Sequence, residues 1–376
     1  MDRCVCIKIA PNVAQIAQLQ ALAAHFAAVC GFVASVAQAQ KIKKRFELHH
    51  AAYYGARHHS QAAAQIAVLA IKQVAASYKQ LSTAGALHAD KLWPALALNA
   101  RGAIPFDART YRIKGDGFSL YTLEGRMTVP WVLGKRQKAM LKRGTPQEAR
   151  LVNKRGKWFM HVAIRQNSPK AAQGSDVLGL DVGEVNIAAT SSGMVFKANR
   201  LRHDRDKFES RRARLQRNGS QSAKQALKKA SGREARHVKH INHVTSKRIV
   251  AEALTQGASA IAMEDLTHIR LRIKAGKRMR ARLHRWPWRQ LQDFVAYKAE
   301  QAGIAVAYID PAYTSKTCAQ CFCLGQRHRS YFKCSCGSQR HADVNAASNI
   351  RRLALPIDGA TPYVTAGHVA FSPPDL

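Results

Sequence analysis

The sequence predicts an α/β protein of two lobes, in which a small antiparallel β-barrel with a helical insertion precedes a larger domain of strands and helices. Three observations predict it. Short strands separated by turn residues fill about 101–166, strands alternate with helices from about residue 176, and four closely spaced cysteines precede the last helix. The polar segment 167–175 contains Pro169 and Gly174 and marks the boundary between the lobes.

The charge of the chain indicates its kind of partner. The 376 residues include 60 Lys and Arg against 23 Asp and Glu, a formal net charge of +37. Such an excess repels itself in the compact state and suits a polyanion that releases counterions on binding. A hydrophobic content of 47% excludes a disordered basic tail. We therefore expect a nucleic-acid partner, and the alternatives are a cationic scaffold of the ribosomal kind or an adaptation to the protein's surroundings.

The cysteines and the N-terminal segment indicate a cytoplasmic protein. The start of the chain has no apolar core followed by a cleavage site, so no signal peptide is expected. Gln and His side chains interrupt the Ala-rich stretch 13–39, which argues against a membrane span. Five of the eight cysteines cluster near the C-terminus, as in a metal site of a reducing compartment.

The first lobe begins with a strand at residues 3–9, where apolar side chains alternate with others. A helix rich in Ala, Gln and Val follows Pro11 and runs to about Gln40. A second helix is expected over about 60–81, with the basic run 41–45 between the two.

Residues 1–10 and 101–170 are expected to form the barrel, and 11–100 the helical insertion. A hairpin with its tip at Lys154–Gly156 is the clearest strand pair of the barrel.

The second lobe is expected to alternate strands and helices. The expected elements are a strand at 176–183, a hairpin turning at Ser192–Gly193, helices over 204–254, a strand at 258–266, a helix over 287–301 and a strand at 304–309. Sixteen Lys or Arg and four acids lie between Arg200 and Arg248. This helical region is expected to offer cationic faces to a nucleic-acid duplex. It would contact the sugar-phosphate backbone of the duplex and not its bases.

Two of the expected strands carry a carboxylate at the end of a face of small side chains. Gly179 and Asp181 share one face of the first strand, and Ala262 and Glu264 share one face of the other. Small neighbours leave room for a metal ion or a phosphate. Asp265 points the other way and is expected to be a cap or an ion-pair partner.

A third acid, Asp343, begins a helix on the same face as Ala347 and Ile350. Asp181, Glu264 and Asp343 could converge on a pair of Mg²⁺ ions, an arrangement that hydrolyses phosphodiesters. The alternative for each of them is a carboxylate that ends a strand or caps a helix.

The cysteine spacing predicts a closed tetrahedral zinc site. Its expected ligands are Cys318, Cys321, Cys334 and Cys336. The second pair is one residue tighter than the common spacing, so Cys323 is a competitor for a ligand position. A knuckle that has lost its metal is the other alternative.

Four segments together resemble the TnpB family of transposon-encoded RNA-guided nucleases and the related compact type V CRISPR effectors. They are GLDVGEVNIAAT at 179–190, IAMEDLTHIR at 261–270, YKAEQAGIAVAYIDPAYTSKTCAQC at 297–321 and HADVNAASNI at 341–350. The order is that of the three nuclease motifs and the zinc-binding insert of the family. The resemblance covers about residues 101–355, and Phe322 stands where the family often has Gly.

The resemblance implies an RNase H-like (RuvC) nuclease domain over 171–313 and 337–355 and a zinc-ribbon target-nucleic-acid insert at 314–336. The stretch 356–376 contains Pro and Gly and is expected to be a flexible tail. The resemblance also places the Mg²⁺-binding catalytic acids at Asp181, Glu264 and Asp343. The first lobe would be a wedge-like, oligonucleotide-binding-type barrel with a recognition insertion. The protein would bind a guide RNA, recognise a motif that flanks its target and cut double-stranded DNA. Its expected location is the prokaryotic cytoplasm, at the nucleoid when bound to DNA.

A basic segment and the insert supply further candidate nucleic-acid contacts, since guanidinium groups pair with phosphates and an indole can stack on a base. These candidates are Arg270, Arg272, Lys277, Arg278, Arg280, Arg282, Trp286, Arg327 and Arg329. For Arg327 and Arg329 the alternative is solvated charge. Trp288, at the end of the same basic segment, could also stack on a base, and its alternative is a place in the core.

Two other functions remain open from the sequence. One is an RNA-guided repressor that binds DNA without cutting it, and the other is a transposase or resolvase that acts without RNA. Cleavage of a plasmid with guide and Mg²⁺ distinguishes the first, and co-purified RNA distinguishes the second.

Overall fold

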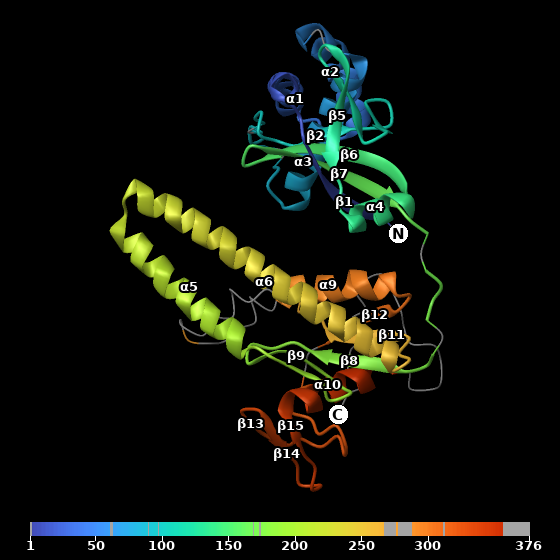
Figure 1. The fold of residues 1–376 in the computed structure, drawn as a ribbon, viewed down its shortest axis with the longest axis vertical. Helices are drawn as coiled ribbons and strands as arrows, with labels where there is room; N and C mark the ends of the chain where they lie inside the picture. The colour runs from blue at the N-terminus through green and yellow to red at the C-terminus, as the bar shows by residue number, and fades with distance from the viewer. Residues whose placement is uncertain are drawn as a thin grey trace. The chain divides into compact units, whose positions relative to one another are not determined.

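The computed structural model describes most of the chain as two compact units, Met1–Asn167 and Ser168–Leu376 (Figure 1). The described residues are 2–60, 63–88, 90–96, 98–167, 169–172, 174–266, 276, 288–310 and 313–355. The expected tail at 356–376 lies outside them, as do the candidate contacts between Arg270 and Trp286.

An antiparallel sheet of seven strands forms the first unit, in the order β2-β6-β7-β1-β5-β4-β3. The expected first strand lies in the middle of the sheet, between β7 and β5. The strands are β1 (Asp2–Ile9), β2 (Ile104–Phe106), β3 (Tyr111–Lys114), β4 (Gly117–Thr122), β5 (Gly125–Val132), β6 (Thr145–Lys154) and β7 (Lys157–Arg165), and the short helix α4 (Lys135–Lys142) joins β5 to β6.

The two edges of this sheet meet, so that the sheet is nearly a barrel. Its edge strands β2 and β3 follow one another in the chain and are joined by a turn in which the amide of Tyr111 donates to the carbonyl of Asp107 at 3.0 Å. The hydroxyl of Tyr111 also donates to the carbonyl of Gln147 on β6. A connection this short is possible only if the sheet curls, which confirms the barrel part of the fold prediction.

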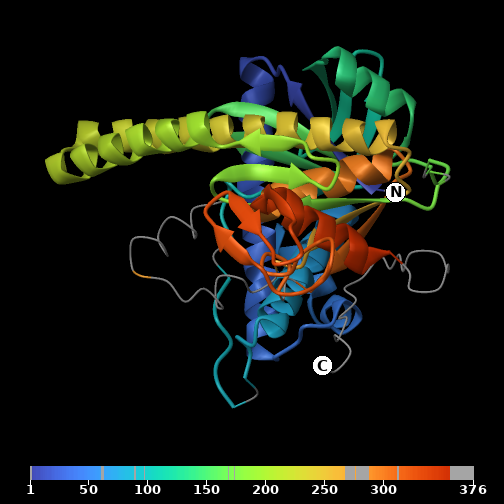
Figure 2. The same ribbon diagram turned by 90° about the horizontal axis from the view of Figure 1, so that it is seen from below.

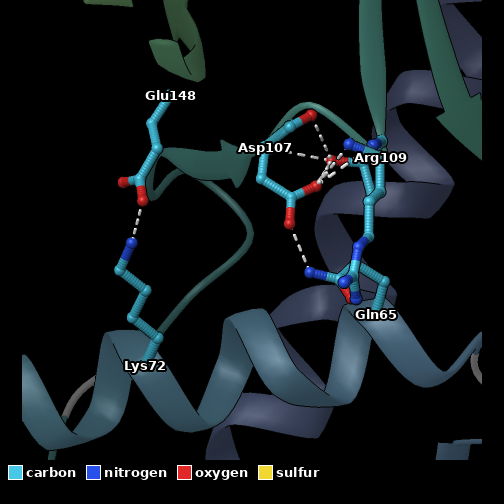
Figure 3. A network of polar contacts seen from close by, with 6 residues as sticks. Gln65, Lys72, Asp107, Arg109 and Glu148 are labelled. Carbon is cyan, nitrogen blue, oxygen red and sulfur yellow. Dashed lines mark hydrogen bonds and ion pairs between the residues drawn. The ribbon is translucent and has the colours of Figure 1, made fainter.

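Three helices occupy the expected insertion: α1 (Val13–Ala39), α2 (Arg45–Ser60) and α3 (Ala64–Thr83). Figure 3 shows α3 tied to the barrel through Gln65, which donates to the carboxylate of Asp107, and through an ion pair between Lys72 and Glu148. The expectation of two helices was wrong. A third helix, α2, lies between the two expected ones and begins at Arg45, the last residue of the basic run 41–45. Its sequence mixes aromatic, His and charged residues without a clear apolar period.

Helix α1 begins with a capping box, in which Asn12 and Gln15 each accept from the backbone amide of the other. Its side chains pack in the core of this unit, where Leu19, Val29 and Val33 are fully buried. Among the described residues it is the one helix long and apolar enough to cross a membrane, and 44% of that stretch is buried within the protein.

The second unit is built on a sheet of five strands in the order β10-β9-β8-β11-β12. The first three strands pair antiparallel, whereas β11 runs parallel to both β8 and β12. The strands are β8 (Val177–Asp181), β9 (Asn186–Thr190), β10 (Val195–Lys197), β11 (Ala260–Glu264) and β12 (Ala305–Ile309), and the helices are α5 (Asn199–Asn218), α6 (Gln221–Thr255), α9 (Trp288–Gln301) and α10 (Ala342–Ala354).

The two faces of this sheet bury different side chains. Large residues such as Leu180 and Met263 pack in one core with α6 and α9. On the other face Ala260 and Ala262 pack with Ile350 of α10.

The small residues on the second face admit helix α10. A Cβ atom at Gly179 would lie 2.0 Å from the carbonyl oxygen of Ala347, so this strand and helix touch backbone to backbone. The expectation that small side chains leave space for a metal ion was therefore wrong along the strands. A helix fills that space and carries Asp343 to the sheet.

Helices α5 and α6 form a long hairpin that projects beyond the sheet in both views (Figures 1 and 2). Leu201 is the one buried side chain of α5, because little of that helix packs on the sheet. An ion pair between Arg212 and Glu234 joins the two helices further out.

A small antiparallel sheet forms the insert between β12 and α10. Its strands are β13 (Gln326–His328), β14 (Tyr331–Lys333) and β15 (Gln339–His341). The sequence suggested that the insert would end at Cys336. Because β15 pairs with β14, the small sheet continues past that residue to His341, and α10 begins directly after it, at Ala342.

Candidate metal and nucleic-acid site

Asp181 and Glu264 end adjacent parallel strands. Each lies one residue beyond the paired Leu180 and Met263, so both carboxylates lie at the same edge of the sheet. Asp343 lies in the first turn of α10, which packs across β8. The tertiary structure thus brings together three acids that are separated by about 80 residues each in the chain.

The charges of these acids act on one another. Burial raises the pKa of Asp181 well above its usual value, and the negative charges of Glu264 and Asp343 raise it further, whereas Arg327 opposes them. Burial also raises the pKa of Glu264, and a hydrogen bond from Thr314 lowers it. Buried acids that repel one another favour a bound cation, so oxygen ligands of this kind fit Mg²⁺.

Both oxygens of Asp343 have partners in the protein. The amide of Asn186 on β9 donates to Oδ2 at 2.8 Å, and the guanidinium of Arg327 donates to Oδ1 at 2.6 Å. Asp343 is 6% exposed, so these contacts compensate a buried charge. The side chain of Arg327 therefore contacts the acidic site. For Arg329, the contact with Arg327 is made by the backbone carbonyl, which accepts from Arg327 Nε at 3.2 Å.

Four cysteines form a compact cluster in the insert. The Sγ atoms of Cys318, Cys321, Cys334 and Cys336 all lie within 4.8 Å of one another, close enough to share a metal ion. Among the described residues the three acids do not form so compact a group, and Asp343 and Glu264 have partners in Arg327, Asn186 and Thr314.

The cluster selects the expected four cysteines and leaves Cys323 outside. Cys323 is exposed, and its thiol donates to the carbonyl of Cys321 at 3.7 Å. Burial raises the pKa of Cys318, but hydrogen bonds from the backbone at Cys321 and Gln320 bring it down to about 6. A thiolate is the form that binds a metal, so this environment suits a ligand.

Phe322 shows why a glycine suits its position. Its φ is 67°, in the left-handed region where a side chain costs about 1–2 kcal/mol. The guanidinium of Arg352 lies 3.6 Å from the centre of the Phe322 ring. This cation–π contact offsets the strain and joins the insert to α10.

Four residues that hold the site together were not predicted from the sequence: Asn186, Thr314, Asn345 and Asn349. Asn345 and Asn349 are buried on α10 and donate to carbonyls at the start of the insert. All four lie within the segments that carry the family resemblance. Amide side chains near Asp181 and Asp343 in the sequence were the signal that could have identified the three asparagines, and Thr314 carried no such signal.

Other candidate residues proved to be structural. Trp288 is 8% exposed and belongs to the core, which confirms that alternative. Two histidines of α6 also have partners within the protein: His237 pairs with Asp204 at 3.0 Å, and His243 stacks on Phe294.

Two family models match this chain. Residues 159–270 match a model described as a probable transposase, and residues 288–350 match the TNB domain of Cas12f1-like proteins. The cryo-EM structure of a Cas12f1–sgRNA–target DNA complex aligns with a TM-score of 0.58 at 19% identity, covering 89% of this chain and 82% of that one. The fold is thus that of the compact Cas12f-type effectors.

Two relatives identify the family more closely. A TnpB-like protein of Methanocaldococcus jannaschii is 35% identical in an alignment of 188 residues that covers 46% of this chain and 67% of that protein. The endodeoxyribonuclease Cas12f1 of Sulfoacidibacillus thermotolerans is 31% identical in an alignment of 223 residues that covers 53% of this chain and 50% of that protein. The chain belongs to the TnpB-like family, as the resemblance in its sequence indicated.

Proposed function

We propose that the protein is an RNA-guided endonuclease that cleaves DNA by Mg²⁺-dependent phosphodiester hydrolysis. The observation that carries this proposal is the convergence of three acids from two strand ends and a helix start, within electrostatic reach of one another; Asp343 is buried, and Asp181 and Glu264 are half-buried. Membership of the TnpB-like family and relatives named as endodeoxyribonucleases support it.

In this proposal Asp181, Glu264 and Asp343 would hold the catalytic metal. When bound, Mg²⁺ supplies an activated water and stabilises the charge on the leaving oxygen. Arg327 would neutralise Asp343 until the metal arrives, and Asn186 would keep the carboxylate oriented. The order of the sheet, with three antiparallel strands followed by two parallel ones, supports an RNase H-like (RuvC) domain.

The four clustered cysteines would hold a structural Zn²⁺ ion, since four thiolates form a closed tetrahedral site without an open position for substrate. The insert reaches the acids through Arg327 and adjoins them through α10. Its proposed role is to shape the path by which DNA reaches the acids.

One side of the α5–α6 hairpin would bind the guide RNA through its phosphates. Leu215 on α5 and Ala230 on α6 are among the positions turned toward the neighbouring helix, and Arg212 pairs with Glu234. In an antiparallel helix pair, the residues just before such positions project to the same side of both helices. Six exposed cations occupy these places: Lys207, Arg211, Arg214, Lys229, Arg233 and Arg236.

The proposed partners are therefore a guide RNA and a double-stranded DNA target, and the proposed location is the prokaryotic cytoplasm. Purification under mild salt should yield protein with bound RNA. With that RNA, a matching plasmid and Mg²⁺, the protein should cleave.

Asp181→Ala and Glu264→Ala should abolish this cleavage and leave RNA and target binding nearly intact. Target binding without cleavage by the wild type would favour an RNA-guided repressor. Absence of co-purified RNA would contradict the RNA-guided function.

A further inference from the structure

Thr314 lies between the second acid and the helix that carries the third. It is 4% exposed and lies in the turn that leads from β12 into the cysteine-bearing insert. Its hydroxyl Oγ1 donates to Oε1 of Glu264 at 2.5 Å. Its carbonyl oxygen accepts from Nδ2 of Asn349 at 2.9 Å. One residue therefore contacts two elements of the acidic site with two different groups.

Several hydrogen bonds hold the turn that contains Thr314 against α10. Asn349 is 1% exposed and also donates to the carbonyl of Thr317 at 2.7 Å. Asn345, one turn earlier on α10, donates to the same carbonyl and accepts from the amide of Ala319 at 2.9 Å. Because Asp343 lies on this helix, the turn at residues 314–319 fixes its distance from β11.

The contact with Glu264 is directional. A glutamate carboxylate at the end of three rotatable bonds can turn in several ways. A hydroxyl that donates to one oxygen holds the group in one orientation and favours its charged form. The opposite side of Thr314 is anchored to α10, so this orientation is tied to the position of the third acid.

We propose that Thr314 is a positioning residue that sets the carboxylate of Glu264 relative to Asp343 for metal binding. The hydroxyl fixes the carboxylate, and the carbonyl fixes the helix. This inference rests on the proposed function, in which both acids hold the metal.

Two variants separate the hydroxyl from the rest of the residue. Thr314→Val keeps the shape and the backbone carbonyl and removes the donor, whereas Thr314→Ser restores the donor. Thr317→Val is the matched control, because the Thr317 hydroxyl lies in the same turn and donates to the carbonyl of Tyr313 at 3.0 Å.

The first measurement is a titration of Mn²⁺ into the RNA-loaded protein without target. The electron paramagnetic resonance signal of the free ion reports how much Mn²⁺ is bound. Thr314→Val is expected to weaken Mn²⁺ binding about 10- to 100-fold, the range of a hydrogen bond to a charged group. Thr314→Ser should recover most of the affinity, and Thr317→Val should match the wild type. Guide-RNA affinity and unfolding temperature should stay close to the wild type in all three.

The second measurement is the cleavage rate with target DNA, which should fall in Thr314→Val in the same proportion. Wild-type Mn²⁺ affinity in Thr314→Val would overturn the inference. A loss of affinity that Thr314→Ser does not restore would also overturn it, because the hydroxyl would then not be the cause. If the wild type binds Mn²⁺ but does not cleave, the proposed function fails while the positioning role is still decided by the binding measurement.

Discussion

The guanidinium of Arg327 lies 2.6 Å from the carboxylate of Asp343, so the cysteine-bearing insert reaches the third acid of the site. Arg327 comes from β13 of the insert and Asp343 from the helix that follows it. The pair gives the buried carboxylate a positive partner where a metal ion is proposed to bind. The two cations would therefore compete for Asp343.

This competition predicts the behaviour of Arg327→Gln. Without metal the variant should lose about 1–3 kcal/mol of unfolding free energy, because Asp343 loses a charged hydrogen bond. Mg²⁺ should then raise its unfolding temperature more than that of the wild type, since the ion no longer displaces a guanidinium. Thermal unfolding with and without Mg²⁺ measures both effects. Arg329→Gln, an exposed neighbour, is the control, and equal stabilisation by Mg²⁺ in wild type and Arg327→Gln would contradict the competition.

The cysteine cluster predicts which thiols hold zinc. Cys334→Ser should lose the bound metal and much of the stability of the insert, because Cys334 is buried among the other three. Cys323→Ser should keep the metal, since that thiol lies outside the cluster. Metal analysis of the purified proteins gives the zinc content of each. Loss of zinc in Cys323→Ser, or retention in Cys334→Ser, would assign the ligands differently.

Phe322 predicts an unusual order of stabilities. Phe322→Ala removes the contact with Arg352 but keeps a Cβ in the left-handed region, whereas Phe322→Gly removes the contact and the strain. The glycine variant should therefore be more stable than the alanine variant by about 1 kcal/mol. Unfolding in urea compares the two directly. An alanine variant at least as stable as the glycine variant would show that the left-handed backbone carries no cost here.

The cationic side of the α5–α6 hairpin predicts a directional effect on RNA binding. Neutralising Arg211, Arg214 and Arg233 together should weaken guide-RNA binding. The slope of the logarithm of RNA affinity against the logarithm of salt concentration should become shallower by about 1 for each lost phosphate contact. The matched control neutralises three other exposed cations of the hairpin, Arg217, Lys224 and Lys228. RNA affinity across a salt series measures the difference. Equal losses in the two triple variants would mean that the hairpin attracts RNA by its total charge alone.

Much of the second unit could be predicted because its signals are local. The period of two along a strand placed Gly179 with Asp181, and the spacing of the cysteines selected four ligands that the structure gathers within 4.8 Å. Helix α2 was not predicted, because its sequence carries no such local signal. It lacks a clear apolar period, and tertiary contacts with α1 and α3 hold it in place.

The sequence by itself determined the family, the cationic character, the cysteine cluster and the three acids that stand at strand ends and a helix start. Only the tertiary structure decided what surrounds them. It placed α10 on Gly179, turned Arg327 toward Asp343 and linked Glu264 to Asn349 through Thr314. The physical reason is that strand alternation and ligand spacing depend on neighbours in the chain. Contacts between residues 16 to 168 positions apart depend on how helices and strands pack, and the chain does not encode that locally.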